Sequence, residues 1–195
     1  MAKVKVLVEG YAKEIDRIEY ASSTVVLVEA GKDKIIVDPG MDRKMLLEAL
    51  KREKISAKDI NKVILTHMHP DHVLLAGIFE NAEIIYSTEN YHFDGMIEEN
   101  FSEADSEGVE IIHTPGHDPW HYSVIVDTDK GKIVIASDLF WWKDGVEQKT
   151  DRESLMNLED PYMKDEKALK ESRKKILGIA DFIIPGHGKM FKLGK

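Results

Sequence analysis

Short apolar runs rich in β-branched residues recur along the chain, and each predicts a β-strand. Some of these runs follow one another across Gly31 or another short turn, which is the pattern of a β-hairpin. The predicted strands are residues 4–8, 24–28, 34–37, 62–65, 83–86, 109–112, 122–127, 132–136 and 182–184.

Amphipathic segments lie between these strands. One helix is predicted after Asp42, which can cap it, and a second over residues 164–179. A short helix is predicted at 73–79 and a helical turn at 88–93, and residues 94–108 are predicted to form an acidic surface loop. The predicted apolar faces of the two longer helices are Met45, Leu46, Ala49 and Leu50, and Leu169, Ile176, Leu177 and Ala180.

Strands and helices are interleaved in two halves, with more sheet than a simple parallel wound fold would contain. This order predicts a single domain over residues 1–195, built as a sandwich of two sheets flanked by helices. A chain of 195 residues is long enough to bury a sizeable core in one such domain.

Composition narrows the functional classes. Hydrophobic residues make up 43% and charged residues 32% of the chain, as in soluble globular proteins. No span approaches the roughly 20 apolar residues of a membrane helix, and the first residues lack an apolar signal segment, so a cytoplasmic protein without a membrane partner is expected. The net charge of −9 disfavours broad nucleic-acid binding. Since the chain has no cysteine, a transition-metal site would have to use imidazole and carboxylate.

The most distinctive stretch follows the predicted strand at 62–65 and contains His67, His69, Asp71 and His72. In an extended segment His67 and His69 project to the same side and can bind one ion. Asp71 and His72, at the start of a helix, turn toward a neighbouring point, so the spacing suggests two ions. Three imidazoles and a carboxylate this close together are costly to bury unless a cation offsets their desolvation.

Three other predicted strands also end in metal-capable residues, namely His117, Asp138 and His187. Because strand ends on one edge of a sheet converge, these residues can join the histidine-rich loop in one site. Lone histidines such as His92 and His113 are instead expected to be half-buried structural residues.

The motif His67-Met68-His69-Pro70-Asp71-His72 resembles the H-x-H-x-D-H signature of the metallo-β-lactamase superfamily. Thr114-Pro115-Gly116-His117, then Asp138 after an apolar strand, then Pro185-Gly186-His187-Gly188 match the later motifs in order. The resemblance implies a four-layer αββα sandwich, an α/β (α+β) fold, with a dinuclear metal site at one edge of the two sheets.

The same resemblance implies a role for each residue. Zinc is the expected metal for both sites, although iron or manganese would suit the same ligands. Asp71 is the expected catalytic residue, which orients a metal-bridging hydroxide and passes its proton to the leaving group. The implied ligands are His67, His69 and His117 for the first ion and Asp71, His72 and His187 for the second, with Asp138 shared by both and Asp38 bracing the histidine loop.

Two branches of the superfamily suggest substrates. Gly116-His117-Asp118-Pro119-Trp120-His121-Tyr122-Ser123 resembles the histidine element of acyl-homoserine lactonases, but Trp141 stands where those enzymes have a catalytic tyrosine. Residues 171–188 resemble the metallo-β-lactamase-domain-containing protein 1 branch, which is associated with endoribonuclease action. The expected reaction is therefore hydrolysis of a phosphodiester, slightly favoured by this likeness, or of an ester or lactone.

The basic run Arg173-Lys174-Lys175 is interspersed with glutamates on a predicted helix, so it is predicted to be a solvated face and not an RNA-binding patch. The substrate is expected to be a small molecule or a short RNA. The candidates for the wall of its cleft are Tyr11, Trp120, His121, Trp141 and Trp142. The aromatic members could equally lie in the core or in a homodimer contact.

Other activities fit the same residues. A thioesterase-type ester hydrolase is one of them. A mononuclear iron enzyme resembling the sulfur dioxygenases would use only His67, His117 and Asp138, and a metal-binding protein without catalysis would need no substrate cleft.

Overall fold

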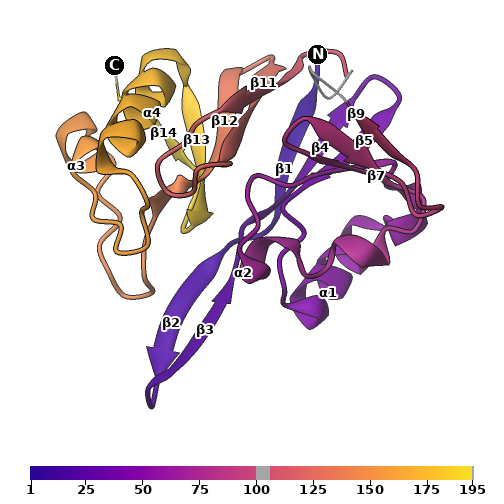
Figure 1. Cartoon of the computed structure of the whole chain (residues 1–195), viewed down its shortest axis with the longest axis horizontal. Helices are drawn as coiled ribbons and strands as arrows, with labels where there is room; N and C mark the ends of the chain where they lie inside the picture. The colour runs from indigo at the N-terminus through magenta and orange to yellow at the C-terminus, as the bar shows by residue number, and fades with distance from the viewer. Residues whose placement is uncertain (100–105, 195) are drawn as a thin grey trace.

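The computed structural model describes residues 1–99 and 106–194. Part of the predicted acidic loop, residues 100–105, lies outside the described residues. The remainder forms two facing sheets with helices on their outer sides (Figure 1).

The larger sheet has seven strands. Val37 of its third strand pairs in parallel with Ile64, and Ile64 pairs in parallel with Ile85, whereas the outer strands pair antiparallel. The strands in spatial order are β1 (Lys3–Val8), β4 (Val25–Ala30), β5 (Asp33–Val37), β6 (Lys62–Ile64), β7 (Glu83–Tyr86), β8 (Glu89–Tyr91) and β9 (Ile97–Glu99).

The smaller sheet has five strands, of which β12 and β13 are parallel neighbours. In spatial order they are β10 (Val109–His113), β11 (Tyr122–Thr128), β12 (Gly131–Trp141), β13 (Phe182–His187) and β14 (Phe191–Lys192). Because the two strands are parallel, the carboxyl ends of β12 and β13 lie at the same end of the sandwich.

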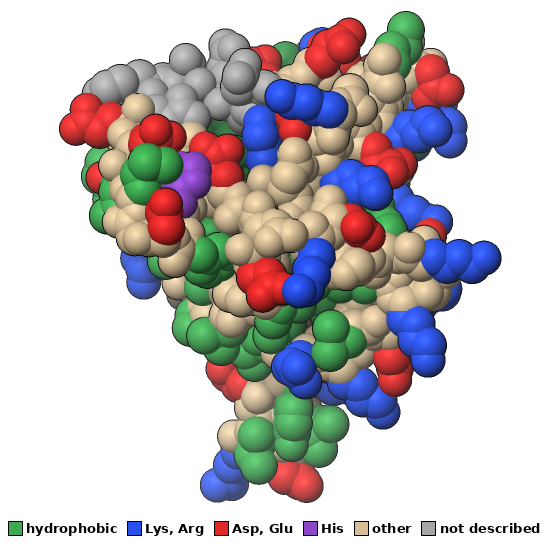
Figure 2. All heavy atoms as spheres, turned by 90° about the vertical axis from the view of Figure 1, so that its right-hand side faces the viewer, with side chains coloured by type: hydrophobic (Ala, Val, Ile, Leu, Met, Phe, Trp, Pro, Cys, Tyr) green, Lys and Arg blue, Asp and Glu red, His purple; other side chains and the backbone are tan. Residues whose placement is uncertain are grey.

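Strands β2 (Tyr11–Ile15) and β3 (Ile18–Ser22) form a separate two-stranded ribbon that projects from the body (Figure 1). Asp16 and Arg17 at its tip both have positive φ, the conformation of a tight two-residue hairpin turn. Hydrophobic side chains are visible on the ribbon at the bottom of Figure 2. The sequence pattern did not predict this ribbon, because Lys, Glu, Asp and Arg interrupt its apolar residues.

Helices cover the outer faces of both sheets, as expected for an αββα sandwich. The helices are α1 (Arg43–Glu53), α2 (Pro70–Val73), α3 (Arg152–Met156) and α4 (Glu166–Ile179), with 3₁₀ turns η1 (Ala57–Asp59) and η2 (Ala76–Ile78). Successive side chains of β4 point to opposite faces of the sheet and so contribute to two apolar clusters. Val26 and Val28 face the other sheet, while Val25 and Leu27 pack in the cluster beneath α1. A third apolar cluster joins the smaller sheet to α4. The predicted fold class is confirmed.

Several local predictions were wrong. The helix predicted at 73–79 is only the short α2 followed by η2, and residues 89–91 of the predicted helical turn at 88–93 form strand β8. Part of the predicted acidic loop forms β9. These short strands are added at a sheet edge, where backbone pairing with a neighbour outweighs weak local propensity. Helix α3 was not predicted either.

Neither described stretch of the chain contains a helix long and apolar enough to cross a membrane.

Leu46 and Met45 provide a test of the α1 packing. Leu46 is 1% exposed, whereas Met45, predicted to share its face, is 38% exposed. Leu46→Ala should therefore lower the free energy of unfolding by about 2–5 kcal/mol, because it leaves a cavity under the helix. Met45→Ala should change it by less than about 0.5 kcal/mol. Urea unfolding of both variants measures this, and equal losses would contradict the assigned helix face.

Candidate metal centre

Seven side chains predicted to bind metal converge at one end of the sandwich, where strands of both sheets end. They lie in or near strand ends, in the loops that follow them, or at the start of α2. His67 and His69 follow β6, Asp71 and His72 begin α2, His117 lies between β10 and β11, Asp138 lies in β12, and His187 ends β13.

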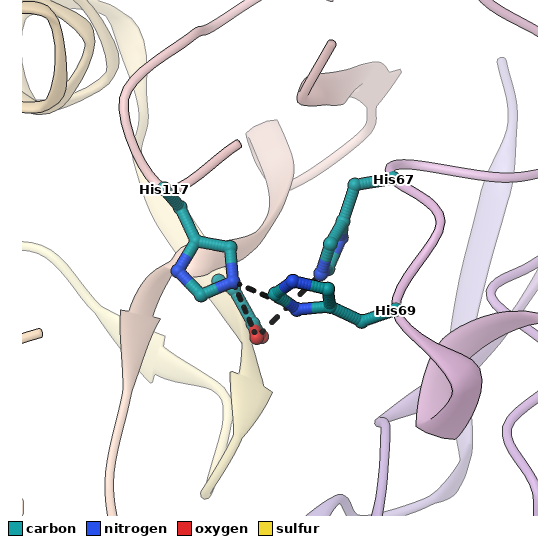
Figure 3. Close-up of side chains that lie close together, drawn as sticks. His67, His69 and His117 are labelled. Atoms are coloured by element: carbon teal, nitrogen blue, oxygen red, sulfur yellow. Dashed lines mark hydrogen bonds and ion pairs between the residues drawn. The ribbon is translucent and has the colours of Figure 1, made fainter. Parts of the chain in front are cut away.

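The seven side chains form two groups, and within each group the potential ligand atoms lie within 4.8 Å of one another. Figure 3 shows His67, His69 and His117 pointing toward one another around a carboxylate oxygen. One group is His67, His69, His117 and Asp138, and the other is Asp71, His72 and His187.

The Asp138 carboxylate lies between the two groups. Its Oδ2 atom is 3.4 Å from His117 Nε2 and 3.8 Å from His67 Nε2. Its Oδ1 atom is 3.3 Å from His72 Nε2 and 3.8 Å from His187 Nε2. Each oxygen thus faces a different set of imidazoles, which is the arrangement a shared carboxylate ligand requires.

Four of the histidines make a hydrogen bond through Nδ1, the ring nitrogen that faces away from the centre of the site. The acceptors come from different parts of the chain and include a carboxylate, a hydroxyl and a backbone carbonyl. A hydrogen bond at Nδ1 fixes the orientation of the ring and leaves the Nε2 lone pair directed into the site. The pairs are His72 with Asp38 Oδ2 at 2.9 Å, His117 with Asp160 Oδ2 at 2.7 Å, His187 with the Tyr11 carbonyl at 3.0 Å, and His67 with Thr66 Oγ1 at 3.1 Å.

Asp38 links the end of β5 to the histidine loop. Its carboxylate accepts hydrogen bonds from the Thr66 backbone N–H at 2.8 Å and the Thr66 hydroxyl at 2.7 Å. The Ser137 hydroxyl donates to the same carboxylate at 3.1 Å. Asp38 and Ser137 both have positive φ, an uncommon backbone conformation for such residues that tends to occur at functional sites.

Asp160 was not predicted from the sequence. It is 4% exposed, and besides His117 it accepts hydrogen bonds from Trp141 Nε1 at 3.3 Å and the Tyr162 backbone N–H at 3.0 Å. It lies in an irregular segment between α3 and α4, where Asp160-Pro161 signals a turn but no ligand spacing. Only its packing against His117 reveals its role.

Several buried polar atoms in the site have no hydrogen-bond partner among the described residues: His67 Nε2, His72 Nε2 and Asp138 Oδ1. Buried polar atoms are normally satisfied, and leaving them unpaired costs free energy. Imidazole nitrogens and carboxylate oxygens are ligands of zinc and other transition metals. The convergence of these unpaired atoms therefore fits a metal site.

A cleft of about 410 Å³ opens onto the metal-centre residues His69, Asp71, His117, Asp138 and His187. Its other walls come from the β2–β3 ribbon, from the loop before α1, from the end of β12 and from the chain that follows β12. Members that bear on substrate binding are Lys13, Tyr20, Met41, Trp141, Lys143 and Tyr162.

Of the five predicted cleft residues, Trp141 alone is among the described residues that line this cleft. Trp142 is 6% exposed and packs against Phe191 in the core, because neighbouring residues on a strand project to opposite sides. Trp120 is 58% exposed beside His113.

His121 and Tyr11 contact residues of the metal centre but do not line the cleft. His121 is fully buried, its Nδ1 lies 3.0 Å from Thr114 Oγ1, and its ring lies 5.2 Å from that of His67. The Tyr11 hydroxyl donates to Asp42 at 3.1 Å, and its backbone carbonyl holds His187. Tyr162, whose ring lies tilted against Trp141 with the ring centroids 5.7 Å apart, is a cleft residue that the sequence did not reveal.

Comparison with known proteins identifies the family to which this fold and site belong. A model of the metallo-beta-lactamase superfamily matches residues 20–102. Metallo-beta-lactamase domain-containing protein 1 from Xenopus laevis is 32% identical over 201 residues, which cover 98% of this chain and 82% of that protein. The chain belongs to the metallo-β-lactamase superfamily. The predicted family and branch are confirmed, and the chain is classed with the metal-dependent hydrolases of the superfamily.

Solved structures agree on the metallo-β-lactamase fold. A metallo-beta-lactamase candidate from Thermotoga maritima has a TM-score of 0.73 and 24% identity, covering 98% of this chain and 99% of its own. AidC, described as a dizinc quorum-quenching lactonase, has a TM-score of 0.69 and 18% identity, covering 91% of this chain and 77% of its own.

The electrostatics of this metallo-β-lactamase site depend on burial and on the close charges. Burial lowers the pKa of His67 well below its usual value, and the neighbouring His72 lowers it further. Burial would also lower the pKa of His72, but the carboxylates of Asp138 and Asp38 raise it well above its usual value. Although burial raises the pKa of Asp138, His72 and His187 hold it well below the usual range. Without metal, a proton on His72 therefore offsets the carboxylate charge.

Gly186 permits the close approach of two strands at Asp138. A Cβ atom on Gly186 would overlap Asp138 Oδ1 and also crowd the Ser137 backbone. These atoms belong to the shared carboxylate and its strand, so neither can move freely.

Gly186→Ala should lower the metal content, because the added methyl displaces Asp138 from between the two groups. Gly178→Ala is the control: this position in α4 has nothing within 4 Å of an added Cβ, and the substitution should stabilise the helix by up to about 1 kcal/mol. Metal stoichiometry by mass spectrometry and thermal unfolding measure both effects. Full metal content in Gly186→Ala would contradict the assigned constraint.

Metal binding should release protons. His72 carries a proton below its raised pKa, and a metal at Nε2 must displace it, so affinity should fall by about tenfold per pH unit for each displaced proton below that pKa. Above that pKa the dependence on His72 should disappear. Calorimetry in buffers of different ionisation enthalpy counts the protons, and an affinity that does not change between about pH 6 and 8 would contradict the assignment.

Proposed function

We propose that this chain is a dinuclear metal-dependent hydrolase that acts on a small ester or lactone. One observation carries the proposal: the two oxygens of Asp138 face two separate groups of imidazoles. The inward nitrogens of His67 and His72 are buried and make no hydrogen bond to another described residue. The fold likeness to AidC, described as a dizinc lactonase, supports two ions.

The donor sets suggest how two ions would be held. Zinc is the proposed metal, since imidazole and carboxylate are common zinc ligands and the similar fold of AidC is described as dizinc. Iron and manganese are the alternatives. Two such ions, when bound, acidify a water molecule and polarise the scissile bond. His67, His69 and His117 would hold one ion, and Asp71, His72 and His187 the other, with Asp138 contributing to both.

Asp71 is the proposed proton carrier. Its side chain is 19% exposed and lines the cleft, whereas the Asp138 side chain is 7% exposed. Burial raises the pKa of Asp71, but the hydrogen bond with His187 and the charge of His72 lower it overall, so the carboxylate is ionised at neutral pH. It can accept a proton from the attacking water and deliver it to the leaving group.

The shape and charge of the cleft favour a compact substrate. A volume of about 410 Å³ suits one small molecule. Glu14 and Glu19 line the cleft as cross-strand neighbours on the ribbon and balance Lys13 and Lys143. Basic and acidic side chains are also mixed on the face seen in Figure 2. A polyanion such as RNA gains little from this balance, whereas an uncharged ester can pack against Trp141 and Tyr162.

A phosphodiester is the second candidate substrate. Lys13 and Lys143 both line the cleft and could receive a phosphate group. A mononuclear iron enzyme using only His67, His117 and Asp138 is less well supported, because it would leave the second group, Asp71, His72 and His187, without an ion.

The test is a panel of generic substrates offered to the zinc, manganese and iron forms. The panel contains a p-nitrophenyl ester, a thioester, a lactone, a β-lactam, bis-p-nitrophenyl phosphate and single-stranded RNA. Ester or lactone turnover with two metals per chain supports the proposal. Turnover of the phosphodiester and RNA alone favours the second candidate, and one iron per chain without hydrolysis contradicts both.

Asp71→Asn should lower kcat on the active substrate by about 10²–10⁴-fold, because the amide cannot accept the proton. Metal content must be measured on the same sample, since Asp71 also lies in the second group of ligands. Unchanged turnover at full metal content would rule out the proton-carrier role.

A further inference from the structure

We propose that Arg173 is a positioning residue of the metal centre. It fixes the carboxylates of Asp138 and Asp160, which contact opposite nitrogens of the His117 ring. The inference rests on the proposed function in that it concerns the ion held by His117. It differs from the sequence-based prediction that Arg173-Lys174-Lys175 is a solvated face. Lys174 and Lys175 are exposed, but Arg173 is only 2% exposed.

The guanidinium of Arg173 connects α4 to two segments that bear these carboxylates. Its Nε atom donates to the Leu139 carbonyl at 2.8 Å, one residue beyond Asp138. Its Nη1 atom donates to the Leu158 carbonyl at 2.6 Å, two residues before Asp160. A single rigid planar group thus sets the distance between the end of β12 and the segment that follows α3.

Both segments meet at His117. Asp160 Oδ2 lies 2.7 Å from His117 Nδ1, and Asp138 Oδ2 lies 3.4 Å from His117 Nε2. Asp160 thereby orients the ring, and Asp138 shares the ion that the ring faces. A shift of either carbonyl that Arg173 holds would displace one carboxylate relative to the other, and small displacements of such partners weaken metal binding.

The burial of Arg173 is costly. Burial lowers the pKa of Arg173 to about 10, so the group stays charged at neutral pH. Its Nη2 atom is buried without a hydrogen-bond partner among the described residues. The Phe140 ring lies 5.8 Å from the guanidinium and offers a cation–π contact, which offsets only part of the desolvation. An apolar side chain would fill this space without the desolvation cost of a buried charge. It could not, however, donate hydrogen bonds to both carbonyls.

The experiment compares Arg173→Met, Arg173→Lys and Leu177→Ala in full-length protein, with Co²⁺ as the probe metal. Leu177 lies one turn along α4 from Arg173, is 4% exposed and packs in the apolar cluster that contains Leu139 and Phe140, so Leu177→Ala reports loss of packing alone. The readouts are Co²⁺ affinity by chelator competition, the visible Co²⁺ spectrum, and the Tm of the metal-free protein.

Arg173→Met should weaken binding of one Co²⁺ equivalent by about 10–100-fold and alter its visible spectrum. Arg173→Lys, which can replace only one of the two hydrogen bonds, should lose less. Leu177→Ala should lower Tm without changing Co²⁺ affinity. The proposal is overturned if Arg173→Met binds both equivalents like wild type, or if Leu177→Ala weakens Co²⁺ binding as much for the same loss of Tm.

Failure of the proposed function has a different signature. A wild-type protein that binds one Co²⁺, or binds two and hydrolyses nothing, contradicts the dinuclear hydrolase. The effect of Arg173→Met on the His117 ion can still be measured in either case. If Arg173→Met does not fold, the Arg173→Lys spectrum decides, since an unaltered spectrum and affinity in that variant would also overturn the positioning role.

Discussion

The Asp138 carboxylate, buried between two sets of imidazoles, is the constraint on which the rest of the site depends. A buried negative charge requires compensation, and here each oxygen faces histidines from a different part of the chain. This position exists because β12 and β13 are parallel neighbours and because Gly186 has no side chain where Asp138 Oδ1 lies. Any change in the separation of these strands would move the carboxylate relative to both groups.

The surrounding protein fixes the orientation of the candidate metal ligands. Asp38, Asp160, Thr66 and the Tyr11 carbonyl occupy the outer nitrogens of four histidines, so each ring enters the site with its orientation set. Positive φ at Asp38 and Ser137 costs backbone free energy, and the apolar core between the sheets supplies the rigidity that maintains it. Metal affinity is thus linked to the packing of the whole sandwich.

Chemistry and specificity are built from different parts of the chain. The groups that could hold metal come from the ends of β6, β12 and β13, from the start of α2 and from the loop between β10 and β11. The wall of the cleft comes from the β2–β3 ribbon and from Trp141 and Tyr162, none of which belongs to the candidate metal ligands. Asp160 joins the two parts, because one of its oxygens orients His117 and the other contacts Trp141 and Tyr162. The position of the substrate wall is therefore coupled to the position of a proposed metal ligand.

The sequence by itself determined most of the strands, the two long helices and the short run from His67 to His72, because these features depend on spacing within a few residues. It could not assign Asp160, Tyr162 or Arg173, because a lone carboxylate, phenol or guanidinium in an irregular or basic segment carries no periodic signal. It also could not decide between Trp141 and Trp142, of which one faces the cleft and the other the core. The tertiary structure decided these points, since each depends on which distant segment packs against the side chain, and no local pattern records that contact.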